Sequence, residues 1–232
     1  MNFRSGRGHG PSVKPLAGRM RSGLGRRYAL HSRRSGLSFT SAVPASFECQ
    51  ATDLMHIGAL SEQHVHAYRE LMLEAYEHAA DAFTTTAEER RAEPMSWWVK
   101  RIGSRAGLTQ AYGAWDKEAL VGSVALEFSS KPKTRHSALI LGMYVRPAYR
   151  GRGVGTKLLQ AAAQGAAERA GIRTLALTLT EGNESAMRLY KAAGFEVWGV
   201  EPLAISTTAG YKGKVHMSRL VQHASTAAPR SA

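Results

Sequence analysis

The chain has 232 residues, of which 44% are hydrophobic, and a formal net charge of +13. This length favours one large domain, or one domain with a tail, and the hydrophobic content is sufficient for a buried core. No apolar run approaches the roughly 20 residues of a membrane-spanning helix, so we expect no membrane partner. The one cysteine, Cys49, excludes an intrachain disulfide and favours a reducing compartment, so we expect a cytoplasmic location.

The positive charge is concentrated near the N-terminus. Residues 1–44 hold nine basic residues and no acidic one, which leaves +4 (+13 minus nine) for residues 45–232. This stretch lacks apolar periodicity and is rich in glycine and serine, so we predict a disordered basic tail over 1–45. A translated leader, an arm that touches nucleic acid or membrane, and a transit peptide remain open. The leader is favoured, and nucleic acid is not the expected partner, because no aromatic residues alternate with the arginines.

A folded domain is predicted over 46–222. Residues 47–57 hold a first strand, and Ser61 is the N-cap of a helix. The apolar face of this helix consists of Val65, Tyr68, Met72, Ala75, Tyr76 and Ala79. Thr86 and Glu89 form a capping box that starts a second helix, and a further turn or helix follows around 96–102.

Within that last segment, Trp97 and Trp98 are adjacent, so one helix cannot bury both, and we expect packing together with a half-exposed ring. Two strands are predicted over 110–115 and 119–128, joined by a turn at 116–118.

A central strand is predicted over 138–145. It is apolar on both faces, which is typical of a buried strand. Gly142 inside it indicates a bulge or the close approach of a ligand.

The remaining elements alternate between helix and strand. A helix over 154–170 is ended by Gly171, and a strand follows over 174–180. Asn183 caps a short helix that Gly194 ends. A strand over 195–200, a loop over 201–213 and a strand over 214–221 complete the domain, and 223–232 are predicted to be a flexible C-terminus.

A basic, glycine-rich turn joins the central strand to the helix at 154–170. It runs through Arg150, Gly151, Arg152, Gly153, Val154, Gly155 and Thr156. The first turn of a helix presents unpaired N–H groups and the positive end of the helix dipole, and glycines allow a ligand to approach the backbone. These features predict a pyrophosphate site. The glycine spacing differs from the dinucleotide fingerprint, and the order Gly-Thr-Lys differs from a P-loop.

The pattern Arg150-x-x-Gly153-x-Gly155 resembles the acetyl-CoA-binding motif of the GNAT N-acetyltransferase superfamily. A second stretch, Asn183-x-x-Ala186-x-x-Leu189-Tyr190-x-x-x-Gly194-Phe195, is similar to the second signature of that superfamily. The resemblance covers about 46–221. It implies a mixed α/β (α+β) fold with a mostly antiparallel central sheet, flanked by helices. Its two parallel central strands splay apart and leave a V for the pantetheine arm.

The resemblance also implies a function. It is the direct transfer of an acetyl group from acetyl-CoA, as cosubstrate, to a primary amine of a small molecule or protein in a ternary complex. The residues implied to bind the cofactor are Met143, Tyr144, Val145, Arg150, Gly151, Arg152, Gly153, Val154, Gly155, Thr156 and Asn183. Tyr190 is implied to be the general acid, although its apolar helix face also suits a core residue. No metal is implied, and the sequence contains no H-E-x-x-H pattern.

Several questions stay open at the level of sequence. The central strand carries no acid, so the general base is undetermined: Glu127, His136, Glu181 and a water chain are the alternatives, with Glu127 as the guess. A non-catalytic acyl-CoA sensor and a protein- or ribosome-directed acetyltransferase with a nucleic-acid-touching tail are the other functions compatible with the sequence. The amine acceptor is undetermined, and the chain is expected to be a monomer or a homodimer.

Overall fold

The structure is a computed structural model that describes residues 55–103 and 107–222. The predicted tail over 1–45, Cys49 and the predicted flexible end over 223–232 lie outside the described residues. Among the described residues, no helix is both long and apolar enough to cross a membrane.

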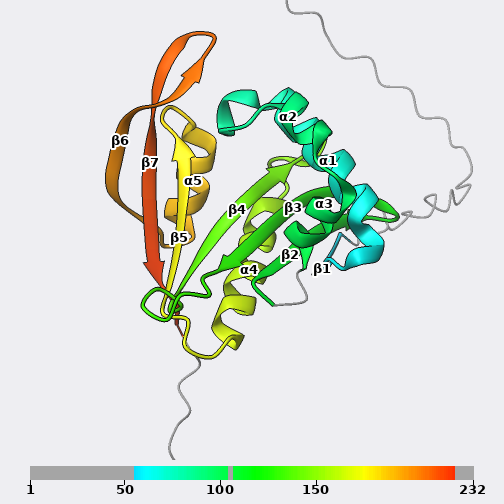
Figure 1. The fold of residues 1–232 in the computed structure, drawn as a ribbon, viewed down its shortest axis with the longest axis horizontal. Helices are drawn as coiled ribbons and strands as arrows, with labels where there is room; N and C mark the ends of the chain where they lie inside the picture. Colours follow the sequence, from blue (N-terminus) through cyan, green and yellow to red (C-terminus); the bar gives the residue numbers. More distant parts are fainter. Residues whose placement is uncertain (1–54, 104–106, 223–232) are drawn as a thin grey trace, which may run out of the picture. The chain divides into compact units, whose positions relative to one another are not determined.

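One seven-stranded sheet organises the described part of the chain (Figure 1). Its strands lie side by side in the order β1-β2-β3-β4-β5-β7-β6. Every neighbouring pair is antiparallel except β4 and β5, which are parallel. The strands are β1 (His56–Ala59), β2 (Thr109–Asp116), β3 (Ala119–Phe128), β4 (Ser137–Val145), β5 (Thr174–Thr180), β6 (Glu196–Thr207) and β7 (Gly210–Leu220). The predicted fold class is therefore confirmed.

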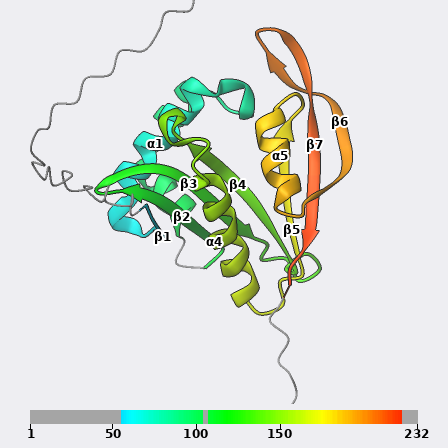
Figure 2. The same cartoon turned by 180° about the vertical axis from the view of Figure 1, so that it is seen from behind.

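Helices cover both faces of the sheet. They are α1 (Val65–His78), α2 (Ala87–Ala92), α3 (Met95–Ile102), α4 (Val154–Glu168) and α5 (Glu184–Ala192), with short 3-10 segments η1 (Glu62–His64), η2 (Ala80–Ala82) and η3 (Pro147–Tyr149). Helices α1 and α3 lie on one face, whereas α4 and α5 lie on the other, as the two opposite views show (Figures 1 and 2). Each face has its own buried cluster: Leu158 and Leu175 belong to the α4 side, and Tyr68 and Trp98 belong to the α1 side.

The parallel strands β4 and β5 separate soon after they begin. Their pairing covers only Ser137–Leu139 against Thr174–Ala176, and β4 continues to Val145 while β5 continues to Thr180. This gap is the splay that the resemblance implied. The expectation that β4 is buried throughout is wrong, because β4 has no partner strand on this side beyond Leu139 within the described residues. Leu139 is 40% exposed, and Leu141, Gly142 and Met143 are half-buried.

The bulge predicted at Gly142 is confirmed. The pairing of β3 with β4 shifts between Ser123, which lies opposite Tyr144, and Ala125, which lies opposite Leu141. Gly142 has a φ of 61°, a left-handed value that favours glycine. The buried Ser123 hydroxyl donates a hydrogen bond to the Gly142 carbonyl at 3.2 Å, so the extra residue keeps its acceptor satisfied.

Local sequence patterns correctly predicted the starts of two helices and the burial of one tryptophan pair. The Thr86 hydroxyl accepts from the Glu89 N–H at 3.2 Å, and the Glu89 carboxylate accepts from the Thr86 N–H at 2.7 Å, as a capping box requires. The Asn183 side chain accepts from the Ala186 N–H at 3.2 Å. Trp98 is buried and Trp97 is half-buried, as expected for the pair.

The loop predicted over 201–213 is wrong, because β6 and β7 form a long hairpin there. The pairing of the two strands is irregular between Glu201 and Ile205, and Leu203 has a φ of 53°. This irregularity contains Pro202 and interrupts the apolar alternation by which a strand is recognised in a sequence. The strand resumes at Ile205, and the chain reverses between Thr207 and Gly210.

Candidate functional site

The glycine-rich turn opens α4 without a side-chain cap. Gly153 is the N-cap residue, with a φ of 77°, and Gly151 has a φ of 76°. A Cβ atom placed on either glycine would meet no heavy atom within 4 Å, so the backbone is open to a ligand on that side. The first N–H groups of α4 are therefore accessible as an anion site requires, and the binding of pyrophosphate there stays a prediction.

Interactions within the domain hold this turn in place. The Tyr149 hydroxyl donates to the Asp116 carboxylate at 2.7 Å, which ties η3 to the β2–β3 turn. Arg150 Nε donates to the Val145 carbonyl at 2.9 Å. The Arg152 guanidinium lies 5.4 Å from the centre of the Tyr149 ring. Both arginines are exposed, and these contacts keep their side chains beside the turn.

A cleft of about 800 Å³ runs from this turn into the gap between β4 and β5. All the residues that the sequence proposed for cofactor binding line it, except Arg152: Met143, Tyr144, Val145, Arg150, Gly151, Gly153, Val154, Gly155, Thr156 and Asn183. Asn183 lines the cleft while its side chain caps α5, so the same residue can serve both roles.

A segment that the sequence analysis did not select forms another wall of the cleft. Residues 77–83, which are the end of α1 and the segment that follows it, line the cleft together with Thr180 and Lys212. The Thr180 hydroxyl donates to the Asp81 carbonyl at 2.6 Å, and Lys212 Nζ lies 2.9 Å from Asp81 Oδ2. This segment therefore bridges from α1 to β5 and β7. No signal in the sequence could have found contacts between residues about a hundred positions apart.

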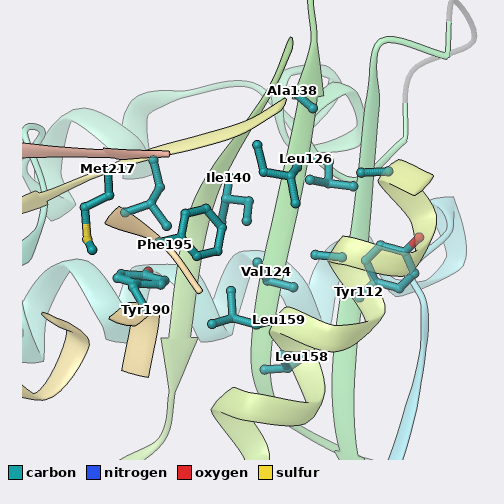
Figure 3. Close-up of a cluster of buried hydrophobic side chains, with 14 of the residues drawn as sticks. Tyr112, Val124, Leu126, Ala138, Ile140, Leu158, Leu159, Tyr190, Phe195 and Met217 are labelled. Carbon is teal, nitrogen blue, oxygen red and sulfur yellow. The ribbon is translucent and has the colours of Figure 1, made fainter. Parts of the chain in front are cut away.

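Tyr190 lies at the edge of this site rather than in it. It is buried, it packs against Phe195 with ring centres 6.0 Å apart, and it is not among the residues that line the cleft (Figure 3). Its helix neighbour Leu189 does line the cleft. Burial raises the pKa of the Tyr190 hydroxyl to about 12, so this group keeps its proton near neutral pH. The catalytic role of Tyr190 stays a prediction.

Comparison with known proteins agrees with this geometry. The model of the Acetyltransferase (GNAT) family matches residues 68–195, which include both sequence motifs and the whole β4–β5 gap. The chain belongs to the GNAT acetyltransferase family. Its members are acyltransferases, and this chain is an acyltransferase by membership.

Curated relatives of this GNAT domain match just over half of the chain. The thialysine N-epsilon-acetyltransferase of Bos taurus is 30% identical over 122 residues, which are 53% of this chain and 71% of the relative. A Bacillus subtilis (strain 168) protein described as a phosphinothricin acetyltransferase is 32% identical over 125 residues, which are 53% of this chain and 71% of that relative.

Solved structures share the GNAT fold. A structure from Salmonella typhimurium, described as an acetyltransferase with its cofactor acetyl-CoA, has a TM-score of 0.61 and 21% identity, covering 77% of this chain and 99% of that one. The ribosomal-protein-S18-alanine N-acetyltransferase of Escherichia coli has a TM-score of 0.57 and 17% identity, covering 75% and 99%.

The candidate bases of this GNAT domain lie in three different places. Glu181 lines the cleft, where its carboxylate accepts from the Gly213 N–H at 3.1 Å. His136 is exposed in the β3–β4 connection. Glu127 lies on the α3 side of the sheet, 4.0 Å from Arg101, and lines a separate cavity. The structure therefore brings only Glu181 together with the proposed cofactor residues.

A carboxylate that contacts the cleft residue Tyr144, without lining the cleft itself, was missed by the sequence analysis. Glu74 accepts hydrogen bonds from the Tyr144 hydroxyl at 3.1 Å and from Arg146 Nε at 2.8 Å. Burial, and then the negative charge of Glu74, raise the pKa of Tyr144. Among residues 55–103 and 107–222, no group of three or more His, Cys, Asp or Glu side chains could hold a metal ion.

Proposed function

We propose that this protein transfers the acetyl group of acetyl-CoA to a primary amine of a small molecule or protein. The observation that carries the proposal is the continuity of the cleft, which connects the open turn at 150–156 to the unpaired edge of β4. Acetyl-CoA supplies an activated acetyl thioester when it is bound. The residues of this chain bind it, orient it and manage the protons.

Binding of the cofactor is proposed to use backbone groups at both ends of the cleft. The N–H groups at the start of α4 hold the pyrophosphate, and the positive charges of Arg150 and Arg152 lie beside it. The N–H groups of Met143 and Val145 pair with the pantetheine amides, since an unpaired strand edge needs hydrogen-bond partners. Two ends fixed in this way hold the thioester in one orientation, so that proximity contributes much of the rate.

Tyr190 is proposed to supply a hydrogen bond or a proton to the departing thiolate. Its pKa of about 12 keeps the phenol protonated, as a donor must be. The amine attacks directly, without a covalent acyl-enzyme intermediate. Initial rates measured at several concentrations of both substrates then give intersecting reciprocal plots, and Cys49→Ala, which removes the only thiol, keeps full activity. Parallel plots, or loss of turnover in Cys49→Ala, would contradict direct attack.

The decisive experiment is a thiol-release screen with acetyl-CoA across amine classes, run alongside calorimetric titration of acetyl-CoA. We expect tight acetyl-CoA binding and amine-dependent CoA release. Binding without release for any amine would favour a non-catalytic acyl-CoA sensor. No binding of acetyl-CoA would remove the proposal.

The domain boundary and the basic tail are tested by truncation. We propose that the catalytic domain spans 46–222 and that the segment 1–44 is dispensable for folding and for acetyl transfer. A chain that starts at Ala45 should keep its activity and its melting temperature. If the full chain binds RNA in a salt-sensitive way and the shortened chain does not, the alternative of a nucleic-acid-touching tail gains support.

A further inference from the structure

A second cavity, of about 1020 Å³, lies on the face of the sheet that carries α3. Val99, Leu139 and Ala176 contribute its apolar wall, and Leu108 and Phe128, which pack into the cluster on the α4 side, border it. We call it the α3 cavity. It is separate from the cleft that contains the glycine-rich turn, because the two share no lining residue.

The α3 cavity reaches the closed end of the gap between β4 and β5. Leu139 and Ala176 are the last residues through which these strands pair, and both line the cavity. Met143 and Thr180, four residues further along the same strands, line the other cleft. The two openings therefore meet the same gap at points about 13 Å apart along the strands.

Charged side chains of both signs face the α3 cavity. Glu127 lies opposite Leu139 in the pairing of β3 with β4, and its side chain is 51% exposed. Lys100 and Lys131 also line the cavity, and neither ammonium group has an ion-pair partner among the described residues. Glu62 lines the cavity as well, so the cavity combines an apolar wall, two carboxylates, of which Glu127 lies beside the β4–β5 gap, and two lysines.

We propose that the α3 cavity is the acceptor site and that it takes a small amino acid with an apolar side chain. The Glu127 carboxylate accepts hydrogen bonds from the ammonium group, holds it opposite Leu139 at the end of the gap, and takes the proton that the nitrogen must lose before it attacks the thioester. Lys100 or Lys131 binds the carboxylate, and the apolar wall receives the side chain. A polyamine fits this lining less well, because it has no carboxylate to pair with Lys100 or Lys131 and no apolar side chain to cover the wall. This inference rests on the proposed acetyl transfer and names its acceptor.

The test uses the full-length protein and three probes: L-leucine, L-leucinamide and spermidine. We expect L-leucine to be acetylated with a kcat/KM at least about tenfold above that of L-leucinamide, since the amide lacks the carboxylate. Spermidine should be the poorest acceptor. Calorimetric titration of L-leucine into protein saturated with CoA measures its affinity for the α3 cavity, and no acetyl transfer occurs in this experiment.

Conservative variants locate the site. Glu127→Gln and the double variant Lys100→Met/Lys131→Met should each weaken L-leucine binding by about ten- to a hundredfold, as expected for lost charge-assisted hydrogen bonds. Acetyl-CoA affinity and melting temperature should not change. Lys133→Met is the matched control, because Lys133 lies in the same connection as Lys131 but does not line the cavity, and this variant should bind L-leucine normally.

The failures of the two proposals are distinguishable. If acetyl-CoA binds and some other amine is acetylated while L-leucine neither binds nor reacts, the amino-acid acceptor is wrong and the acetyltransferase proposal stands. Equal binding of L-leucine by the wild type, Glu127→Gln and the double lysine variant would also overturn the α3 cavity as its site. If acetyl-CoA itself does not bind, the proposed function fails.

Discussion

The anion site proposed at the start of α4 can be tested by comparing two substitutions of a single glycine. Gly153 has a φ of 77°, and a Cβ placed there meets no heavy atom within 4 Å. Asn and Asp have nearly the same shape, and both tolerate the left-handed backbone better than other side chains, at a cost of about 1 kcal/mol. Gly153→Asn and Gly153→Asp therefore differ in charge and in little else.

The size of the effect follows from the position of the residue. If the pyrophosphate lies on the N–H groups of α4, the carboxylate of Gly153→Asp lies close to it, at a separation of about 4 Å. Two unit charges about 4 Å apart repel by about 1 kcal/mol in water and by about 4 kcal/mol near a protein surface. We expect Gly153→Asp to bind acetyl-CoA about five- to several-hundredfold more weakly than Gly153→Asn, with the difference shrinking as salt is added.

Isothermal titration at two salt concentrations measures this difference, and thermal melting checks that both variants are folded. Gly171 provides a matched control, since it has a φ of 85° and equally open surroundings but lies beyond the other end of α4. Gly171→Asn and Gly171→Asp should bind acetyl-CoA alike. If Gly153→Asn and Gly153→Asp also bind acetyl-CoA alike, the pyrophosphate does not sit on this turn.

Three more predictions concern buried tyrosines and one buried glycine. Tyr190→Phe should lower kcat by about ten- to a thousandfold at unchanged acetyl-CoA affinity and melting temperature, and full activity with chemistry rate-limiting would leave Tyr190 as a core residue only. Burial raises the pKa of Tyr68 and of Tyr190 to about 12, so their contribution to stability is complete below the ordinary pKa of 10.0 and is lost as the pH rises toward 12. The free energy of unfolding, measured with urea across this pH range, should fall less in Tyr68→Phe than in the wild type. An equal fall in both proteins would contradict the raised pKa of Tyr68. Gly165→Ala would place a Cβ 1.8 Å from the Tyr112 hydroxyl, so it should destabilise the fold by about 1–3 kcal/mol in spite of the better helix propensity of alanine. A more stable Gly165→Ala variant would show that Tyr112 moves aside at no cost.

Much of this fold and of the cleft at the glycine-rich turn could be predicted from the sequence, because the interactions that determine them are local. The capping box of Thr86 and the Asn183 cap each join residues three positions apart. The glycine-rich turn needs only a strand, positive-φ glycines and a following helix, all within a short stretch of chain. Gly142 likewise predicted the bulge in its own strand. For these features the sequence carries both the residue type and its geometric reason.

Tertiary structure alone decided the features that depend on distant segments. Apolar residues on both faces predicted a buried β4, but burial depends on what lies beside a strand, and β5 leaves β4 after Leu139. Glu74 meets Tyr144 across 70 positions, and Asp81 meets Thr180 across 99. In the sequence, Glu127 is one of several candidate acids. Only the pairing of β3 with β4 shows that it lies opposite Leu139 and lines a cavity. Such contacts follow from how strands and helices pack together, and neither residue spacing nor local propensity encodes which distant partner a side chain will find.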